Sequence, residues 1–280
     1  MNHPKAIVHL DRLARNYKIL SNSVNGKRLM AVVKANAYGH GAIECSKTLE
    51  DQGCDFFSVF TVEEAKELRN AGLKSDILIL SKLEKESIQT AIDNDLIVNI
   101  SSIDDLDSII FHLEKNGLSP RFHMKIETGM NRLGFDLSDI SLAIGKLLDY
   151  KNLNCEGIYT HYATSDEGDL SYAHLQLERF EQALEIANEM GYTFKYKHIS
   201  NSGGLLNELS SNTNLLRLGI LLYGIYPSKD VEKKYVLEPV LEFKAPIVDY
   251  RKTQKGAMVS YGGLYKTKKD TIIGIIQCGF

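Results

Sequence analysis

The chain has 280 residues, of which 44% are hydrophobic and 25% are charged, as is usual for a folded globular protein. A formal net charge of −3 shows no basic excess, which argues against a nucleic-acid-binding protein. The cysteines, Cys45, Cys54, Cys155 and Cys278, include no CxxC pair, so we expect neither a disulfide framework nor a bound metal.

No segment of the chain has the composition of a membrane-crossing or secretory sequence. The apolar runs are all shorter than the ~20 residues that span a bilayer. The N-terminal stretch MNHPKAIVHLDRLARN lacks the continuous apolar core of a secretory signal. Together with the scattered cysteines, these features favour a cytoplasmic protein that has no membrane partner.

Eight short runs rich in β-branched, aromatic and other apolar residues follow one another along most of the chain. They are residues 29–35, 56–60, 76–80, 96–100, 121–127, 156–161, 196–201 and 215–220. Longer amphipathic stretches separate them, and this alternation predicts repeated strand–helix units. Eight such units favour an α/β fold of the (β/α)8 TIM barrel type. The alternative, a doubly wound open sheet, lacks its usual GxGxxG or GxxxxGK[ST] signal here.

One intervening stretch, TVEEAKELRNAG, carries clear helix boundary signals. Thr61 is a good N-cap and Glu64 stands three residues on, which is the spacing of a capping box. Gly72 stands where a C-terminal cap belongs. We therefore expect a helix between Thr61 and Gly72.

The residue pattern changes after about residue 230. The runs VLEPVLEFKAPIVDYRKT, AMVSYGGLY and TIIGIIQCGF read as β-strands joined by polar turns, without helical spacing. We therefore divide the chain into a barrel at 1–230 and a C-terminal β domain at 231–280. Because the last run ends at Phe280 inside what reads as a strand, we expect only a partial β domain.

Lys34 stands at the end of the first predicted barrel strand, after the apolar run AVV. The carboxyl ends of the strands carry the active site in TIM barrels. A lysine that is desolvated there has a lowered pKa, which provides the neutral amine needed to form an imine. The strand position alone is equally compatible with a lysine that points into solvent.

The residues after Lys34 favour a catalytic lysine. Tyr38, Gly39, His40 and Gly41 form a loop whose glycines permit close backbone approach and whose tyrosine can contact a phosphate. The motif VVKANAYGHG resembles the lysine motif of the alanine racemase family, and further family motifs follow in the same order over nearly the whole chain. The resemblance implies a pyridoxal 5′-phosphate (PLP) enzyme in which Lys34 holds the cofactor as a Schiff base.

Two further motifs follow the fifth and sixth predicted strands. KIETGMNRLGF contains Arg132, which by resemblance binds the substrate carboxylate with the fork of donors of its guanidinium. Lys125 in this motif resembles a lysine that is carbamylated in some members, and the resemblance leaves that modification open here. His161 in GIYTHYATSDE matches a histidine that packs against the cofactor ring, whereas by position alone it reads as a structural histidine.

The motif HISNSGG ends the seventh predicted strand and supplies Asn201 and Ser202. In TIM barrels a phosphate often binds after strands seven and eight, through hydroxyls and exposed backbone amides. The sequence RLGILLYG adds the backbone amides of Gly219 and Ile220. We expect these four residues to bind the cofactor, although Asn, Ser and Gly are also ordinary turn formers.

Arg217 lies inside an apolar run, where an unpaired charge is costly. By resemblance it faces the pyridine nitrogen of PLP, where many other PLP enzymes have a carboxylate. Because an arginine stays protonated, it disfavours a proton on that nitrogen and makes the ring a weaker electron sink. This property suits a racemase and counts against the related decarboxylases.

AMVSYGGLY supplies Tyr261, which resembles the second catalytic base of the family, whereas Tyr265 matches a non-catalytic residue. In the family this tyrosine enters the barrel mouth of the partner subunit, so the resemblance implies a homodimer. A tyrosine acts as a base at neutral pH only if a neighbour stabilises its phenolate, and His161 is the expected neighbour. Lys34 and Tyr261 then handle the proton on opposite faces of the substrate Cα.

The resemblance therefore implies an isomerase that interconverts L- and D-alanine by two bases and supplies D-alanine for peptidoglycan. Two alternatives stay open at this point. One is racemisation of serine, because the residues that select the side chain lie in the missing part of the β domain. The other is a PLP-binding barrel with little or no turnover, although the single-domain PLP-homeostasis proteins lack the C-terminal strands expected here.

Overall fold

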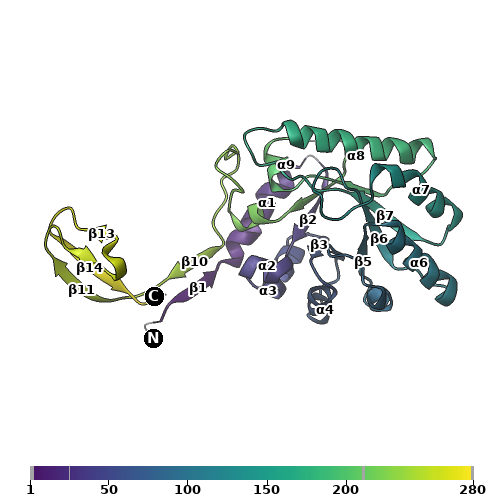
Figure 1. The fold of residues 1–280 in the computed structure, drawn as a ribbon. Helices are drawn as coiled ribbons and strands as arrows, with labels where there is room; N and C mark the ends of the chain where they lie inside the picture. Colours follow the sequence, from purple (N-terminus) through teal and green to yellow (C-terminus); the bar gives the residue numbers. More distant parts are fainter. Residues whose placement is uncertain (1–2, 25, 210–211, 279–280) are drawn as a thin grey trace. The chain divides into compact units, whose positions relative to one another are not determined.

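A computed structural model describes residues 3–24, 26–209 and 212–278 of the chain (Figure 1). The chain forms two compact units. Residues 10–240 make up the first unit. In the second, the segment that ends at His9 joins the segment that begins at Leu241.

The first unit is a barrel of eight parallel strands, which confirms the predicted fold class. The strands are β2 (Arg28–Val32), β3 (Phe56–Val59), β4 (Asp76–Ile79), β5 (Ile97–Ile100), β6 (Arg121–Lys125), β7 (Asn154–Tyr159), β8 (Tyr196–His198) and β9 (Leu215–Leu218). They are hydrogen-bonded in the order β8-β7-β6-β5-β4-β3-β2-β9. Backbone hydrogen bonds also join the two end strands, from Arg217 N to Ser200 O at 3.0 Å and from Asn214 N to Lys197 O at 3.1 Å, so the barrel is nearly closed.

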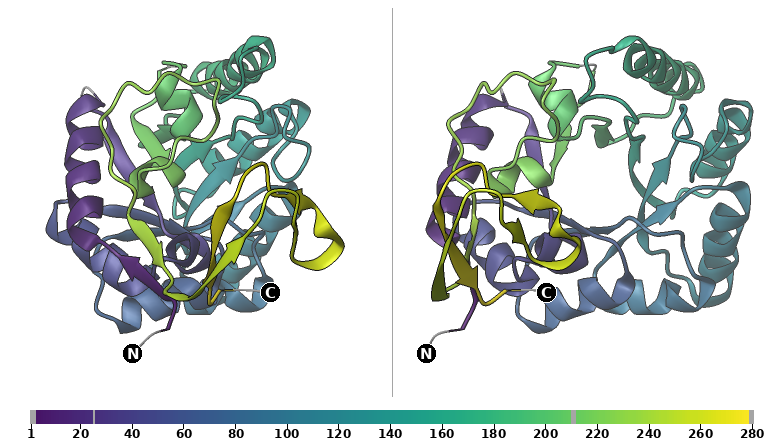
Figure 2. Two further views of the ribbon diagram at one scale, coloured as in Figure 1. Left: turned by 90° about the vertical axis from the view of Figure 1, so that its left-hand side faces the viewer. Right: turned by 60° about the vertical axis from the view of Figure 1, so that its left-hand side comes forward.

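Helices surround the barrel on its outer side (Figure 2). The longer ones are α1 (Leu10–Ser23), α3 (Ala42–Asp51), α4 (Val62–Asn70), α5 (Ile88–Asp93), α6 (Ile103–Asn116), α7 (Ile140–Asp149) and α8 (Ser171–Glu189). Shorter turns are α2 (Lys34–Gly39), α9 (Ser202–Leu206), η1 (Lys85–Ser87), η2 (Leu137–Asp139) and η3 (Ile220–Tyr223). The predicted capping box of α4 is confirmed, because Thr61 and Glu64 each accept a hydrogen bond from the other's backbone N–H. Gly72 follows this helix with a φ of +95°.

The barrel interior is apolar toward the beginnings of the strands and polar toward their ends. Six buried residues from six strands form a hydrophobic cluster: Met30, Phe56, Leu78, Ile97, Tyr196 and Leu215. Because side chains alternate along a strand, the residues two positions further on also face inward. Among these are the buried residues Asn99, His198 and Arg217. Polar groups therefore gather where the carboxyl ends of the strands meet.

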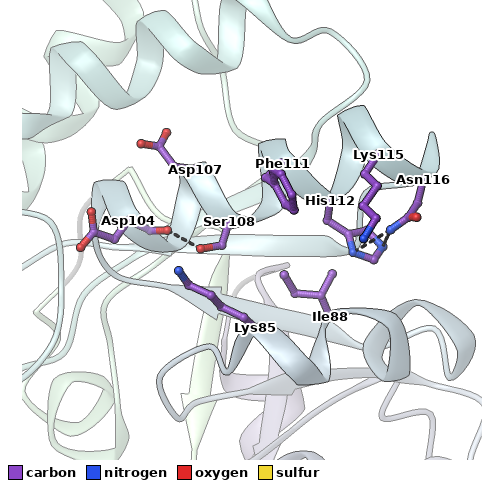
Figure 3. Close-up of a pocket in the computed structure, with 9 residues that line it drawn as sticks. All are labelled: Lys85, Ile88, Asp104, Asp107, Ser108, Phe111, His112, Lys115 and Asn116. Carbon is purple, nitrogen blue, oxygen red and sulfur yellow. Dashed lines mark hydrogen bonds between the residues drawn. The ribbon is translucent and has the colours of Figure 1, made fainter.

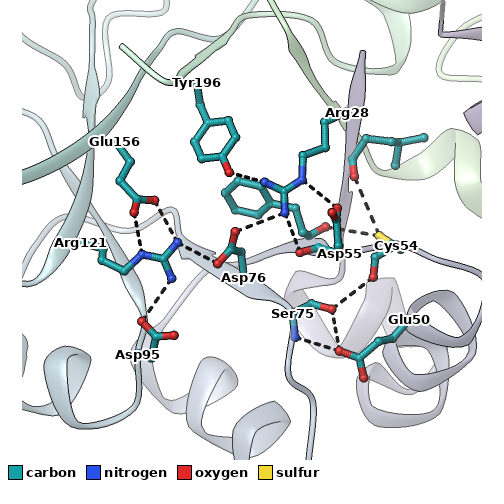
Figure 4. A network of polar contacts seen from close by, with 12 residues as sticks. Arg28, Glu50, Cys54, Asp55, Ser75, Asp76, Asp95, Arg121, Glu156 and Tyr196 are labelled. Carbon is teal, nitrogen blue, oxygen red and sulfur yellow. Dashed lines mark hydrogen bonds and ion pairs between the residues drawn. The ribbon is translucent and has the colours of Figure 1, made fainter. Parts of the chain in front are cut away.

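An ionic network lies where the strands begin (Figure 4). Arg121, the first residue of β6, binds Glu156 of β7 through two hydrogen bonds of 2.9 Å and Asp76 of β4 at 2.8 Å. Asp76 also contacts Arg28 of β2 at 3.3 Å, and Arg28 in turn binds Asp55 at 2.8 Å. The network thus links strands around the barrel at the end that in TIM barrels serves stability.

The second unit consists of antiparallel strand pairs, which confirms the β-strands predicted beyond the barrel. β11 (Ile247–Thr253) pairs with β14 (Thr271–Ile276), and β12 (Met258–Val259) pairs with β13 (Tyr265–Lys266). β10 (Leu241–Lys244) pairs with β1 (Lys5–Val8), from the other end of the chain. Residues 279 and 280, which end the last predicted strand, lie outside the described residues.

Candidate active site

A cavity of about 580 Å³ opens at the carboxyl ends of the barrel strands. It brings together nearly all residues that the sequence predicts for the site: Lys34, Tyr38, Arg132, His161, Asn201, Ser202, Arg217, Gly219 and Ile220. Lys125 also lines the cavity. The exception is Tyr261, which belongs to the second unit.

Lys34 follows β2 after Val33 and begins α2. Burial lowers the pKa of its amine, and the positive charge of Arg132 lowers it further, while Glu64 acts in the opposite direction. A larger share of the amine is therefore neutral at neutral pH than in an exposed lysine. Because only the neutral amine attacks an aldehyde, this environment suits the predicted role.

Lys34 is followed by a turn of left-handed helix, which the sequence does not predict. Residues 35–38 all have φ between 52° and 54°. This region costs an L-amino acid roughly 1–2 kcal/mol per residue. The turn is held from outside, because Glu64 accepts a hydrogen bond from Ala35 N–H at 2.8 Å, and from inside, because Asn36 Oδ1 accepts one from Ala42 N–H at 2.8 Å. Strained backbone that its surroundings hold in place is typical of functional sites.

The left-handed turn brings Tyr38 against Gly219. A Cβ atom at Gly219 would lie 2.5 Å from the Tyr38 hydroxyl oxygen, so any other residue here must displace the tyrosine. Ser202 begins α9 beside them, and Asn201 caps that turn by accepting a hydrogen bond from Gly204 N–H at 2.9 Å. Hydroxyl groups and closely approached backbone therefore converge on one side of the cavity, in a set that suits a phosphate group.

Arg217 crosses the barrel interior and is only 4% exposed. Its hydrogen-bond partners in the described part of the chain are uncharged: the carbonyl oxygens of Thr160 and Ile199, at 2.7 and 3.0 Å, and the Nδ1 atoms of His198 and His161, at 2.7 and 3.0 Å. Burial lowers the pKa of Arg217 to about 10, so it stays protonated at neutral pH. Burial, followed by the charge of Arg217, lowers the pKa of His161 well below its usual value, so His161 is neutral.

Two more cations meet at the cavity from the β6 side. The loop that carries Arg132 folds over Glu127, whose carboxylate accepts a hydrogen bond from Arg132 N–H at 3.2 Å. Arg132 itself is exposed, so its guanidinium can meet a carboxylate that enters from solvent. Lys125 is buried, and this burial, with the charges of Arg132 and Arg217, lowers its pKa to about 8.

The cavity lining carries a large excess of positive charge. Its cationic residues are Lys34, Lys82, Lys125, Arg132 and Arg217, whereas its one acidic residue is Asp166. Such an excess attracts an anionic ligand. The cationic lining, the hydroxyl groups of Tyr38 and Ser202 and the amine of Lys34 therefore fit a ligand that carries a phosphate and an aldehyde, as PLP does.

The motifs single out neither Tyr159, which lines the cavity, nor His198, which packs against Tyr159 from outside the lining. Tyr159, at the end of β7, lies beneath Arg217 and Lys125, whose charged groups are 5.3 and 5.9 Å from its ring centre. His198 stacks on Tyr159 with ring centres 4.7 Å apart. The signal that could have found both residues is the alternation of side chains along β7 and β8, which turns them inward.

A second cavity, of about 470 Å³, lies on the outside of the barrel between α5 and α6 (Figure 3). Its polar groups are engaged with one another, since Asn116 Nδ2 lies 3.1 Å from His112 Nδ1 and the Ser108 hydroxyl donates to Asp104 O. The Ser108 hydroxyl is thus engaged with the backbone of its own helix, and we assign no chemistry to this cavity.

Tyr261 begins η4 (Tyr261–Gly263) in the second unit and is 94% exposed. The residue before it, Ser260, has a φ of 60° and a ψ of −169°, a region that normally only glycine occupies. A Cβ atom at Gly263 would lie 2.6 Å from Met258 Cε. A tight and strained turn therefore displays this tyrosine on the surface of its unit.

Two family models match the sequence: "Alanine racemase, N-terminal domain" over residues 8–227 and "Alanine racemase, C-terminal domain" over residues 240–280. The chain belongs to the alanine racemase family. This result confirms the resemblance on which the sequence interpretation depends. Within the part of the chain that the structure describes, no helix is long and apolar enough to cross a membrane.

Individual alanine racemases match over almost the whole chain. Those of Methanococcus maripaludis and Desulforamulus reducens are each 36% identical to it, and the matches cover 100% and 98% of this chain and 76% and 75% of the relatives. A solved alanine racemase from Clostridium difficile 630 has a TM-score of 0.86 at 31% identity, covering 99% of this chain and 73% of that one. The biosynthetic alanine racemase of Pseudomonas aeruginosa has a TM-score of 0.86 at 28% identity, covering 100% and 76%.

Proposed function

We propose that this member of the alanine racemase family interconverts L- and D-alanine with PLP bound in the barrel cavity. The observation that carries the proposal is Lys34, an amine with a lowered pKa at a strand end, among the other cations of the cavity. When bound, PLP supplies a ring that withdraws electrons from the amino-acid Cα and so makes its hydrogen acidic. The residues of the chain bind and orient the reactants and move the proton.

The residues around the cavity divide the binding of the cofactor among them. Tyr38, Ser202 and the backbone amides of Gly219 and Ile220 would hold the phosphate, and Asn201 fixes the turn from which Ser202 projects. Arg217 would serve the ring nitrogen. Because its partners within the described residues are neutral, Arg217 keeps its full positive charge and would disfavour a proton on that nitrogen.

Two bases on opposite faces of the substrate move the proton. Arg132 binds the carboxylate of the amino acid, which fixes the Cα between the bases. Lys34 handles the proton on one face, and Tyr261 of the partner subunit handles it on the other. His161 assists this tyrosine: its Nδ1 accepts from Arg217, so in the neutral ring Nε2 carries the hydrogen and can donate to the phenolate.

This mechanism requires a homodimer, in which each subunit supplies Tyr261 to its partner. The 94% exposure of Tyr261 supports this arrangement, as do exposed apolar side chains of the second unit such as Val248, Tyr250 and Ile272. We place the reaction in the cytoplasm, where it supplies D-alanine for peptidoglycan. The four unpaired cysteines support a reducing compartment.

Two measurements test the proposal. Borohydride reduction of the PLP-loaded protein, followed by peptide mass mapping, is expected to place a pyridoxyl group on Lys34, and a pyridoxyl group found only on other lysines contradicts the proposal. A coupled assay for D-alanine is expected to detect product with the unaltered chain and none with Lys34→Ala. Tyr261→Phe is expected to keep the pyridoxyl adduct and lose turnover. A parallel assay with L-serine distinguishes the two substrates, and a chain that acts on neither refutes the racemase function.

A further inference from the structure

A buried chain of polar side chains leads from Arg217 away from the cavity and into the barrel. Arg217 Nη1 lies 2.7 Å from His198 Nδ1, and His198 Nε2 lies 2.9 Å from His123 Nδ1. Both histidines are fully buried. His123 lies two residues before Lys125 on β6, and His198 ends β8 in register with Tyr159, so both side chains occupy inward-facing positions.

The chemistry of arginine fixes where each hydrogen lies along this chain. A guanidinium can only donate, so His198 Nδ1 must be an acceptor without a hydrogen. In a neutral ring the hydrogen of His198 is then on Nε2, from which it donates to His123 Nδ1. By the same argument His123 carries its hydrogen on Nε2. All the donors therefore point away from Arg217.

The surroundings of the two histidines favour the neutral state. Burial lowers the pKa of His123 to about 3, and burial followed by the charge of Arg217 lowers that of His198 well below its usual value. His198 stacks on Tyr159 with an interplanar angle of 2°, and the Tyr159 hydroxyl donates to Asn99 Oδ1 at 2.8 Å. Neutral partners thus hold Arg217 without cancelling its charge, which a carboxylate in their place would do.

Close packing fixes the His123 ring, which is the far end of this hydrogen-bonded chain. Gly157 of β7 lies under the His123 ring, and a Cβ atom there would be 2.8 Å from the ring atoms. Phe56 and Tyr196 pack on the ring with centres 5.9 and 5.6 Å away. His123 Nε2 has no polar partner within the described residues. The series of hydrogen bonds therefore ends at this N–H, among aromatic rings.

We propose that His123 and His198 are positioning residues that hold the Arg217 guanidinium at the floor of the cavity as a cation with only neutral partners. The pair acts on the reaction through Arg217 and does not touch the ligand. It sets the place and the charge of the group that, in the proposed function, faces the ring nitrogen of PLP. Only this last step depends on the proposed function, because the hydrogen-bonded chain belongs to the protein alone.

The positions of the hydrogens can be measured without cofactor or substrate. The chain has eight histidines, and 15N labelling of their rings with NMR distinguishes the two neutral forms and the protonated one. At pH 7 we expect His123, His161 and His198 each to carry one hydrogen, on Nε2. A hydrogen on Nδ1 of His198, or a protonated His198, overturns the proposal whatever the chain catalyses.

Two variants test, with the same NMR spectra, the direction in which the hydrogen bonds run from Arg217 to His123. In Arg217→Met the donor is gone, so the His198 and His161 signals are expected to change toward a mixture of forms. In His123→Leu the donor remains, and His198 is expected to keep its hydrogen on Nε2. The opposite pattern, with His198 fixed by His123 and insensitive to Arg217, refutes the proposed order.

Cofactor affinity tests the consequence for the cavity. His198→Leu removes the acceptor of Arg217 and is expected to weaken PLP binding at least tenfold, measured by titration of the unloaded protein. His198→Asn keeps an oxygen acceptor near the place of Nδ1 and is expected to bind PLP within threefold of the unaltered chain. The half-buried His112 of α6, which does not line the active-site cavity, serves as the control, and His112→Leu is expected to leave the PLP affinity unchanged. Equal PLP affinity in His198→Leu and the unaltered chain contradicts a positioning role, while loss of affinity in both His198 variants shows a merely structural one.

Discussion

Gly219 gives the Tyr38 hydroxyl the space in which it lies, and this single contact ties two distant segments of the cavity together. An added methyl group at this position must displace the tyrosine from the phosphate side of the cavity. We expect Gly219→Ala to weaken PLP binding about tenfold, equivalent to ~1.4 kcal/mol, in titrations of the unloaded protein.

Gly145 provides the matched control for this substitution. It lies inside α7, and a Cβ atom there meets nothing within 4 Å. Gly145→Ala is expected to keep the PLP affinity and to stabilise the protein by about 0.5–1 kcal/mol, because glycine is a poor helix former. Unchanged PLP affinity in Gly219→Ala would show that Tyr38 does not need its present position.

The residues of the cavity differ in how far the sequence alone identifies them. Lys34 follows an apolar strand and Arg217 lies within one, and a charged residue at such a place has a chemical reason, whereas Arg132 stands in a loop and is identified by its motif alone. Tyr159 ends β7 and His198 ends β8 close to Tyr196, and aromatic residues in strands are more often part of a core. Only the closing of the barrel brings them beneath Arg217, and no local pattern records that contact.

The left-handed turn after β2 is an element whose geometry depends on a neighbour. Glu64 accepts hydrogen bonds from Ala35 N–H and Phe60 N–H with its two carboxylate oxygens. Glu64→Gln leaves one oxygen acceptor in place of two and puts an amide donor against a backbone N–H. We expect a loss of about 1 kcal/mol in the free energy of unfolding, measured by urea denaturation.

The neighbouring Glu63 separates this effect from a change of charge. It is exposed, and it stands in the same first turn of α4. Glu63→Gln removes the same charge near the helix N-terminus and is expected to cost at most about 0.5 kcal/mol. Equal losses in the two variants argue that Glu64 acts through the helix dipole alone and does not hold the turn.

The ionic network at the start of the strands links elements rather than single residues. Asp76 bridges Arg28 and Arg121, and its side chain is only 20% exposed. Asp76→Asn leaves both arginines without this partner, so we expect a loss of about 2 kcal/mol, between the values for exposed and buried pairs. Asp95 contacts Arg121 at 3.2 Å but its side chain is 72% exposed, so Asp95→Asn should cost less than about 1 kcal/mol in the same urea titration.

The positions of the strands are predicted well, and their ends less well. Residues 29–35 and 196–201 are predicted as strands, whereas β2 ends at Val32 and β8 at His198. The apolar pattern continues past the end of each ladder because the next residues line the cavity or the barrel top. The turn at 35–38 is not predictable, since alanine and asparagine favour it only when Glu64 and Asn36 supply the hydrogen bonds.

The stability of the whole molecule should depend on pH through three histidines of the barrel interior and the cavity. His123, His161 and His198 all have lowered pKa values, chiefly because of burial. Below their ordinary pKa of about 6.5 the unfolded chain binds protons that the folded chain does not, so stability falls as the pH falls. Between pH 7.5 and 5.5 we expect the unloaded protein to lose roughly 1.4 kcal/mol for each histidine, or about 4 kcal/mol in total.

Removing one of these histidines should remove its contribution to the pH dependence of the free energy of unfolding. In His123→Asn the loss between the two pH values is expected to be about 1.4 kcal/mol smaller than in the unaltered chain, measured by urea denaturation. His112 of α6 is only half-buried and offers the control, since His112→Asn should leave the difference unchanged. If the stability of His123→Asn depends on pH as strongly as that of the unaltered chain, the His123 ring of the unaltered chain takes up a proton in the folded state as well.

The pairing of β1 with β10 has a consequence for the order of events during synthesis. Val8 pairs with Leu241, so β1 is synthesised long before its partner strand β10. With about 230 residues between them, translation at ~5–20 residues per second separates the two by roughly 10–50 s. All eight barrel strands are complete at Leu218, before β10 exists. The nascent chain can therefore close its barrel while β1 is still unpaired, and the second unit forms after the barrel.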